Sequence, residues 1–332
     1  MLLVLVLMVT SCDHKDLCYN HREHAHKYHI RIAADYRQDW EENYGYKDWS
    51  AFWPAGYIDY ESLRPEAPKG LRVINYNENL ESNTHNIGAY GGVVTLYEGP
   101  NDILFYNNDT EYIIFSRTDN GVTTRATTRT RTRATYLGNQ YAMEGEPTLT
   151  PPDMLYANYF EDYLAVKTVE PKDVYVTLQP LVYSYKIRYE FSEGLKYVAL
   201  TRGALSGMAA SVTLNTGETS EESATLLYDC EVTDYGARAI VNTFGVPAFP
   251  HPNYPTRAEY THGLSLEVLM RNGKTVIFEF DVTDQVQQQP HGGVIVVSGI
   301  EVKAEDGSQG SGAFDVDVND WGDYEDIYLP LM

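Results

Sequence analysis

Alternation of apolar and polar residues at every second position dominates this chain, whereas helical periodicity is rare. In the clearest stretch, residues 183–191, one face carries Tyr183, Tyr185, Ile187, Tyr189 and Phe191. The positions between them are polar or charged: Ser184, Lys186, Arg188 and Glu190. Because successive side chains of a strand point to opposite faces, this pattern predicts a half-buried antiparallel strand.

A second alternating region surrounds Asn272-Gly273. Before this dipeptide the apolar positions are Leu264, Leu266, Val268 and Met270, and after it they are Val276, Phe278, Phe280 and Val282. Asn-Gly accepts positive φ at both turn positions and matches the twist of paired strands. The region therefore predicts a β-hairpin.

Short apolar runs also fill the N-terminal half. An opening strand is expected at residues 30–36, and further runs lie at 71–76, 93–97, 102–106 and 111–116. Residues with turn chemistry separate them, and we find no repeat with a period of 20 to 50 residues. Short strands at this spacing predict an all-β fold of the β-sandwich type, not a parallel α/β sheet.

The division into domains is predicted from prolines. Pro151-Pro152 and Pro171 flank a stretch that fits either a strand or a short helix, residues 154–169. We place the N-terminal domain at residues 29–169 and the C-terminal domain at residues 170–332.

The N-terminus is typical of a secretory signal. Residues 2–11 form an apolar run that ends in small polar residues and is too short to span a membrane core as a helix. The tetrad Val9-Thr10-Ser11-Cys12 matches the lipobox of bacterial lipoproteins. We therefore predict that residues 1–11 are a signal peptide, that Cys12 is lipidated, and that residues 12–28 form a tether. The alternative is an unmodified apolar terminus that contains a cysteine.

Amino-acid composition limits the classes of molecule that this chain could bind. The formal net charge of −22 would repel phosphate backbones, so we expect no nucleic-acid partner. Apolar residues make up 43% of the chain, enough for real cores, and the 28 tyrosines favour strands. The chain has three cysteines. If Cys12 is lipidated, Cys18 and Cys230 remain, and whether these two form a disulfide stays open. Cys230 lies in an apolar stretch and is expected in the core.

A basic segment follows in residues 123–133, with Arg125, Arg129, Arg131 and Arg133. On an extended chain the last three would share one face, since that face repeats every two residues. Such a face could bind an acidic partner or a glycan. The alternative is a solvated strand edge, where charge deters pairing with other sheets.

Metal and catalytic sites find little support. Five histidines lie in residues 14–29 (His14, His21, His24, His26 and His29), but no closed ligand set accompanies them, so a polar tether is favoured over zinc or copper. Asp315, Asp317, Asn319 and Asp326 match a calcium loop only in part, and a strand with an acidic face is favoured. No nucleophile elbow or phosphate-binding loop is present. We expect no metal, no cofactor and no enzyme; a hydrolase that uses the histidines would require bound zinc.

Several stretches, in this order along the chain, resemble one family: Cys12–Tyr19 followed by His21, Gly91–Thr110, Leu205–Ala209, Asn242–Gly245 and Asp281–Val286. Together they are similar to the fimbrillin-like surface lipoproteins of Bacteroidetes-type bacteria.

The resemblance implies two tandem transthyretin-like Greek-key β-sandwich domains. It also implies an outer-membrane lipoprotein at the cell surface that acts in adhesion or as an accessory or anchor component of fimbriae. Subunits of that group assemble by strand addition, and we nominate residues 313–318, continuing to 327–329, as the strand that completes a sheet in cis or in trans. An anchor keeps its lipid, whereas a polymerising subunit loses it by cleavage, for which Arg31 and Arg37 are candidate sites. We expect the lipid to stay.

The rival interpretation is a glycan-binding surface lipoprotein of a polysaccharide-uptake system. Its platform would be formed by the aromatic residues Trp40, Trp49, Phe52 and Trp53. Binding to glycans or to pilus subunits would separate the two.

Overall fold

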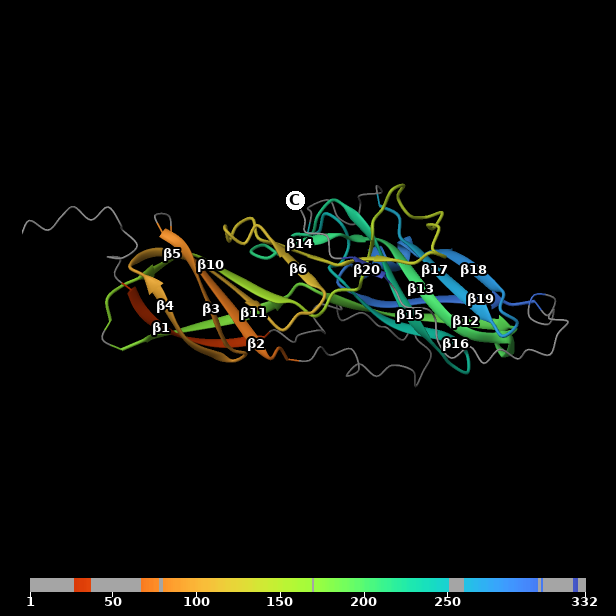
Figure 1. The fold of residues 1–332 in the computed structure, drawn as a ribbon, viewed down its shortest axis with the longest axis horizontal. Helices are drawn as coiled ribbons and strands as arrows, with labels where there is room; N and C mark the ends of the chain where they lie inside the picture. The colour runs from red at the N-terminus through yellow and green to blue at the C-terminus, as the bar shows by residue number, and fades with distance from the viewer. Residues whose placement is uncertain are drawn as a thin grey trace, which may run out of the picture.

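The structure is a computed structural model, and it describes residues 27–36, 67–77, 80–168, 170–250, 260–303, 306 and 325–327. Strands dominate the described residues, and the helices among them are short: η3 (Leu195–Tyr197) and α3 (Thr283–Gln287). The predicted all-β class is confirmed. Figure 1 shows an elongated molecule in which two bodies of strands lie end to end.

The first body is a sheet that closes on itself, here called the closed sheet. Its strands are β1 (Lys27–Tyr36), β2 (Gly70–Asn77), β3 (Leu80–Gly88), β4 (Gly91–Tyr97), β5 (Gly99–Asn107), β10 (Tyr156–Ala165) and β11 (Lys172–Pro180). Their order is β1-β11-β10-β5-β2-β3-β4, and β4 pairs back with β1. The inner face buries apolar side chains such as Ile32, Val73, Leu96 and Phe105. Closure removes the free edges that an open sheet would expose.

The second body is one long sheet, folded so that its strands enclose a core. Its order is β18 (Thr275–Asp281), β17 (Gly263–Met270), β13 (Val198–Ala209), β15 (Ser223–Val232), β16 (Gly236–Thr243), β12 (Tyr183–Glu193) and β19 (Gly293–Glu301). The predicted strand at 183–191 and the predicted hairpin are both confirmed, as β12 and as β17 with β18.

The core of the long sheet joins strands that are far apart in its order. Tyr189 of β12 donates a hydrogen bond to the carbonyl oxygen of Ser265 in β17, 3.1 Å away, and its hydroxyl lies 2.9 Å from that of Tyr228 in β15. Burial, first of all, raises the pKa of Tyr189 well above its ordinary value, so its hydroxyl stays neutral. The layers therefore pack through an aromatic centre with satisfied hydroxyls.

The charged face of β12 is not exposed as the alternation suggested. Lys186 and Arg188 are both 9% exposed. The Arg188 guanidinium lies 4.0 Å from the ring centre of Tyr235, and its Nε lies 2.7 Å from a carboxylate oxygen of Glu190. An arginine can be covered in this way because its charge is paired and its flat head stacks on a ring.

A small sheet lies at the junction of the two bodies: β6 (Ile113–Ser116), β7 (Arg125–Thr128) and β14 (Ser211–Thr213). A shared cluster of buried side chains runs beneath it, including Leu104 and Tyr106 from the first body and Val212 and Phe244 from the second. The junction is thus a continuous core and not a bare linker.

The predicted domain boundary at residue 170 does not coincide with the change of sheet. Residues 172–180 form β11, which pairs with β1 and β10 in the closed sheet, so the chain enters the long sheet only at β12. The parallel β1–β11 pairing joins strands too far apart in sequence for local patterns to reveal. The division into domains itself stays a prediction.

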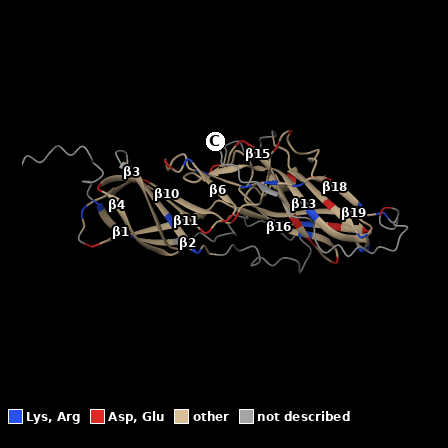
Figure 2. Cartoon of the chain, viewed as in Figure 1, with Lys and Arg blue, Asp and Glu red and all other residues tan. Residues whose placement is uncertain are grey.

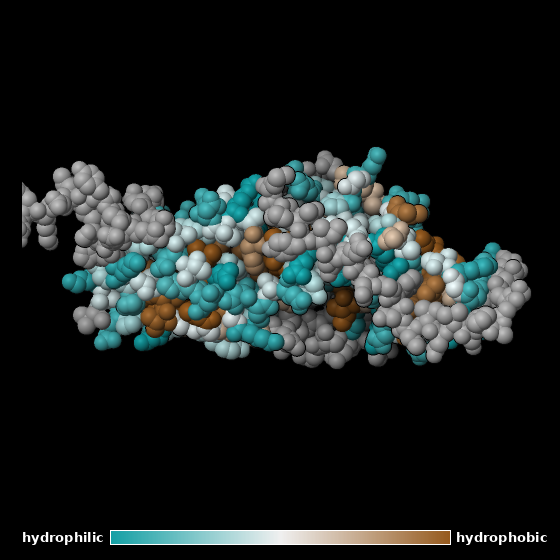
Figure 3. Space-filling view, viewed as in Figure 1, coloured by the Kyte–Doolittle hydropathy of each residue, from teal (hydrophilic) through white to brown (hydrophobic). Residues whose placement is uncertain are grey.

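Figure 2 places basic and acidic residues side by side around β13 and β18, and Figure 3 shows apolar side chains on this face in small separate patches. Among the residues that the structure describes, no helix has the length and apolar character needed for a membrane crossing.

Several sequence features lie outside the described residues. They are Cys12, Cys18, the histidines at positions 14, 21, 24 and 26, Arg37, the aromatic residues from 40 to 53, and the residues 313–318. Cys230, by contrast, is a free thiol that packs against the core of the long sheet, and burial raises its pKa.

Candidate functional site

The feature that we single out is a sheet edge built from short strands, here called the β8 edge. β8 (Thr130–Thr132) pairs on one side with β9 (Thr148–Leu149), which pairs in turn with β15 of the long sheet. On its other side β8 pairs with β20 (Glu325–Ile327). A segment from the far end of the chain is therefore the last strand added to this sheet.

The register of the added strand is defined. Glu325 lies opposite Thr132, Asp326 opposite Arg131 and Ile327 opposite Thr130, in antiparallel pairing. The predicted completing strand included residue 327, which does take part, whereas residues 313–318 lie outside the described residues. Main-chain pairing of this kind gives affinity, and alternating side chains give register.

Main-chain contacts anchor the β8 edge to its neighbours. The amide of Thr150 donates to the carbonyl oxygen of Arg129 at 2.8 Å, and the hydroxyl of Thr148 donates to the carbonyl of Arg131. The guanidinium of Arg131 in turn reaches the carbonyl of Leu227 in β15, 3.4 Å away. The edge is held in place before any further strand is added.

The four arginines of the basic segment have different surroundings. Arg125 is exposed on β7, between β6 and β14. The Arg129 guanidinium lies 5.5 Å from the ring centre of Tyr112, and Arg131 is half-buried beside β15. Arg133 is 8% exposed. The shared open face that we expected for the last three is therefore absent, while binding of a partner by the exposed part of the segment stays a prediction.

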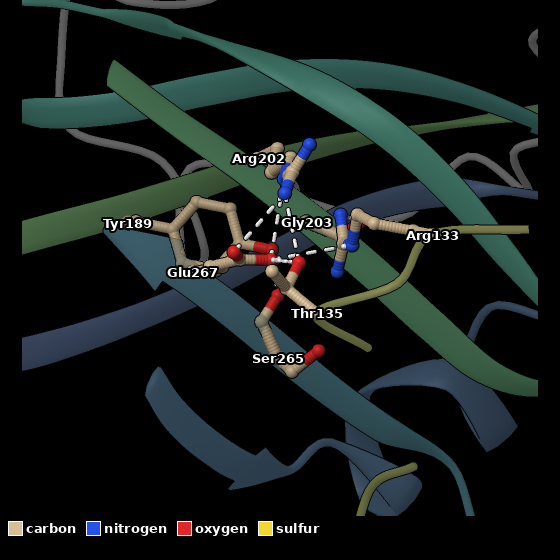
Figure 4. A network of polar contacts seen from close by, with 7 residues as sticks. All are labelled: Arg133, Thr135, Tyr189, Arg202, Gly203, Ser265 and Glu267. Atoms are coloured by element: carbon tan, nitrogen blue, oxygen red, sulfur yellow. Dashed lines mark hydrogen bonds and ion pairs between the residues drawn. The ribbon is translucent and has the colours of Figure 1, made fainter. Parts of the chain in front are cut away.

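Arg133 is buried because it belongs to a charge network across β13 and β17 (Figure 4). Its Nε lies 3.3 Å from Oε2 of Glu267, and its Nη1 donates to the carbonyl of Gly203 at 3.2 Å. Arg202 donates to both carboxylate oxygens of Glu267, at 3.1 and 3.2 Å. Thr135 donates to Oε2 at 2.9 Å and accepts from Arg202 at 2.8 Å.

This network fixes the chain just after β8. Charges in a protein interior are tolerated only when paired and hydrogen-bonded, and here one carboxylate serves two guanidinium groups. Gly203 leaves room for a core side chain beside the network, because a Cβ at that position would lie 2.3 Å from the Tyr228 ring. The network thus ties the β8 edge to the central strands of the long sheet.

Sequence reasoning did not single out Glu267, Arg202 or Thr135. An acid at an outward position of an alternating strand is typical of a solvent-facing residue. What buries Glu267 is the segment from Arg133 onward, which comes from a distant part of the sequence and whose pattern gave no sign that it would cover β17. Among the described residues, no group of three or more histidine, cysteine, aspartate or glutamate side chains could hold a metal ion.

One protein family matches the chain. A family model described as a domain of unknown function (DUF5119) matches residues 57–229, which is more than half of the chain. No curated protein matches the chain.

Several solved structures are similar to this chain at low sequence identity. A candidate adhesin from Bacteroides ovatus is 19% identical with a TM-score of 0.59, and the match covers 89% of this chain and 98% of that one. A second candidate adhesin from Bacteroides ovatus is 11% identical, with a TM-score of 0.46 and coverage of 85% and 91%. The fimbrial anchor protein Mfa2 from Porphyromonas gingivalis is 11% identical, with a TM-score of 0.42 and coverage of 82% and 91%. The first likeness shows that the fold continues over nearly the whole of both chains.

Proposed function

This chain belongs to the DUF5119 family, and from that premise we propose that it is a lipid-anchored, non-catalytic protein of the cell surface that acts in adhesion or as an accessory or anchor component of fimbriae. The fold that it shares with the candidate adhesin from Bacteroides ovatus supports the adhesive role. In this proposal Cys12 carries the lipid and holds the protein on the outer membrane, and the two bodies are tandem transthyretin-like Greek-key domains.

The observation that carries the proposal is the pairing of β20 with β8. A strand from the C-terminal part of the chain completes a sheet whose other strands come from residues 130–301. An edge that accepts one strand presents the same main-chain groups to any other strand of suitable length. We propose that this edge is where a fimbrial subunit joins by strand addition, either by replacing β20 or by pairing with it.

The proposal is tested by locating the protein and its partners in a Bacteroidetes host. The full chain and a Cys12→Ser variant are expressed, the outer membrane is isolated, and proteins that co-purify in mild detergent are identified by mass spectrometry. We expect the wild type in the outer membrane, open to protease added to intact cells, together with fimbrial subunits. The Cys12→Ser variant should leave the membrane fraction.

A deletion of residues 313–332 tests the strand itself. We expect it to change the recovery of fimbrial subunits while the rest of the fold persists, as measured by circular dichroism. Unchanged folding together with unchanged recovery would refute strand addition at this edge, and membrane retention of the Cys12→Ser variant would refute the lipid anchor.

A further inference from the structure

The outer face of β13 and β17 is covered by residues 133–147, here called the covering segment. It is fixed at both ends. Arg133 and Thr135 bind Glu267 at the start, and at the end Glu146 accepts from the amide of Gly207 at 3.1 Å and from the Thr225 hydroxyl. Between these anchor points the segment spans the sheet without filling the space beneath it.

Two neighbouring cavities lie along the covering segment. The first, of about 440 Å³, is lined among others by Arg133, Tyr136, Ser265, Glu267 and Glu279. The second, of about 730 Å³, is lined by part of the same segment, including Asn139 and Glu144. Side chains common to both are Tyr136, Leu137, Gln140 and Glu279, together with Gly138. The covering segment therefore contributes to the walls of both cavities, and each cavity is of the size that small ligands occupy.

Each cavity contains a buried polar group that lacks a partner within the described residues. Ser265 is 2% exposed and lines the first cavity, and its hydroxyl makes no hydrogen bond (Figure 4). Asn139 is 8% exposed and lines the second cavity, and its amide Nδ2 makes none. Leaving such groups unsatisfied costs free energy that a native fold normally avoids, unless water or a ligand completes them.

The rim supplies further free groups. The side chains of Glu279 and Gln140 make no hydrogen bond or ion pair to the described residues, and both line the two cavities. Tyr136 also lines both cavities, with the Arg133 guanidinium 5.5 Å from its ring centre, and burial, first of all, raises the pKa of its hydroxyl, which therefore stays neutral. Donors, acceptors and an aromatic ring are thus gathered along the covering segment and β18.

The unpartnered polar groups that line the two cavities indicate the class of ligand. Asn139 Nδ2 needs an acceptor, Glu279 needs a donor, and the Ser265 hydroxyl can use either. A pure cation cannot satisfy Asn139, and an anion would meet Glu144, Glu146 and Glu279 around the second cavity. The guanidinium of Arg133 is already paired with Glu267, a carboxylate that it shares with Arg202. Neutral hydroxyl groups, which both donate and accept, satisfy all of these positions, and the Tyr136 ring offers a face for the apolar C–H groups of a sugar.

We propose that the two cavities flanking the covering segment form a binding site for a neutral saccharide. The site deepens the proposed adhesive function by naming a ligand class, and it rests on that proposal only for its place at the cell surface. The side chains to be tested, Ser265 and Glu279, belong to β17 and β18 and not to the β8 edge, so glycan binding and subunit recovery can fail independently.

The test begins with the purified full chain on an array of neutral, uronic-acid-containing and amino-sugar-containing glycans. The strongest neutral ligand is then titrated by calorimetry against the wild type, Ser265→Ala, Glu279→Gln and the control Glu218→Gln, whose exposed side chain lies outside both cavities. We expect selective binding of neutral glycans. The first two variants should weaken it by roughly three- to tenfold each, the loss of one hydrogen bond, and the control should not.

Stability separates a ligand site from a merely structural cavity. Removing an unpartnered buried hydroxyl should leave the melting temperature of Ser265→Ala equal to or above that of the wild type, so a loss of affinity cannot be attributed to unfolding. Binding only to charged glycans, no binding on the array, or wild-type affinity in both cavity variants would each overturn the proposal. Any of these results would leave the recovery of fimbrial subunits, and hence the proposed strand addition, untouched.

Discussion

Arg202 binds Glu267 with two parallel hydrogen bonds, at 3.1 and 3.2 Å, where both side chains are less than a tenth exposed. The same carboxylate also holds Arg133, whose Nε lies 3.3 Å away. One acid thereby positions two basic groups from parts of the chain that are far apart in sequence, and it connects the β8 edge to the centre of the long sheet.

Glu267→Gln should destabilise the protein strongly. The substitution keeps the size of the side chain but leaves Arg133 and Arg202 buried without their carboxylate, and breaking a buried pair in this way costs about 3–5 kcal/mol. Urea unfolding followed by circular dichroism measures the free energy. Glu231→Gln is the matched control, because the Glu231–Arg238 pair is exposed and is expected to contribute less than about 1 kcal/mol. Equal effects of the two substitutions would contradict the role assigned to Glu267.

A cross-link tests whether β20 pairs within its own chain. Thr130 and Ile327 lie opposite each other in the β8–β20 pair, so the double variant Thr130→Cys with Ile327→Cys should form a disulfide under mild oxidation. Non-reducing gels should show the bond within monomers if the strand is added in cis, and between chains if it is added in trans. Thr130→Cys with Thr275→Cys is the control, since Thr275 belongs to β18 at the opposite end of the sheet order. Cross-linking no faster than in this control would mean that the pairing does not occur in solution.

Local patterns were enough to predict the strands with clear alternation. β12, β17 and β18 were identified because every second residue is apolar and Asn272-Gly273 forces a turn between the last two. The all-β class follows from the same pattern. Closure of the first sheet was not predicted, because it depends on the parallel pairing of β1 with β11, whose partners are separated by about 140 residues.

The sequence predicted only part of the candidate site. Residue 327 was included in the nominated completing strand, and the basic segment was recognised from its arginines, yet the burial of Arg133 was missed. Arg133 is buried because it pairs with Glu267, more than a hundred residues away, and no local sequence pattern relates the two residues. The unpartnered Ser265 hydroxyl was equally invisible, since a serine at an outward strand position is typical of an exposed surface.

Acid should destabilise the fold through His262. This side chain is 0% exposed, and burial lowers its pKa from 6.5 to about 4 in spite of the nearby Asp281. Above pH 6.5 the imidazole is neutral in both states, so it has no effect. Between pH 6.5 and pH 4 the unfolded chain binds a proton that the folded chain does not, so the free energy of unfolding falls as the pH falls.

The expected loss from His262 alone is about 3 kcal/mol across that window, as an upper bound. Urea unfolding at a series of pH values measures it, and His262→Gln should flatten the profile because glutamine does not titrate. His29→Gln serves as the control, since His29 lies on the partly exposed face of β1. A profile for His262→Gln as steep as that of the wild type would assign the acid sensitivity to other groups.

Gly203 should tolerate no side chain. A Cβ at this position would lie 2.3 Å from the ring of Tyr228, which is held in turn by its contact with the Tyr189 hydroxyl. Neither ring can move freely in the core, so Gly203→Ala should cost about 1–3 kcal/mol, the usual range for overpacking. Gly88→Ala is the matched control, because the nearest atom to a Cβ there lies at an ordinary 3.4 Å. Thermal unfolding should separate the two variants by several degrees, whereas equal melting temperatures would show that the Tyr189–Tyr228 pair can yield.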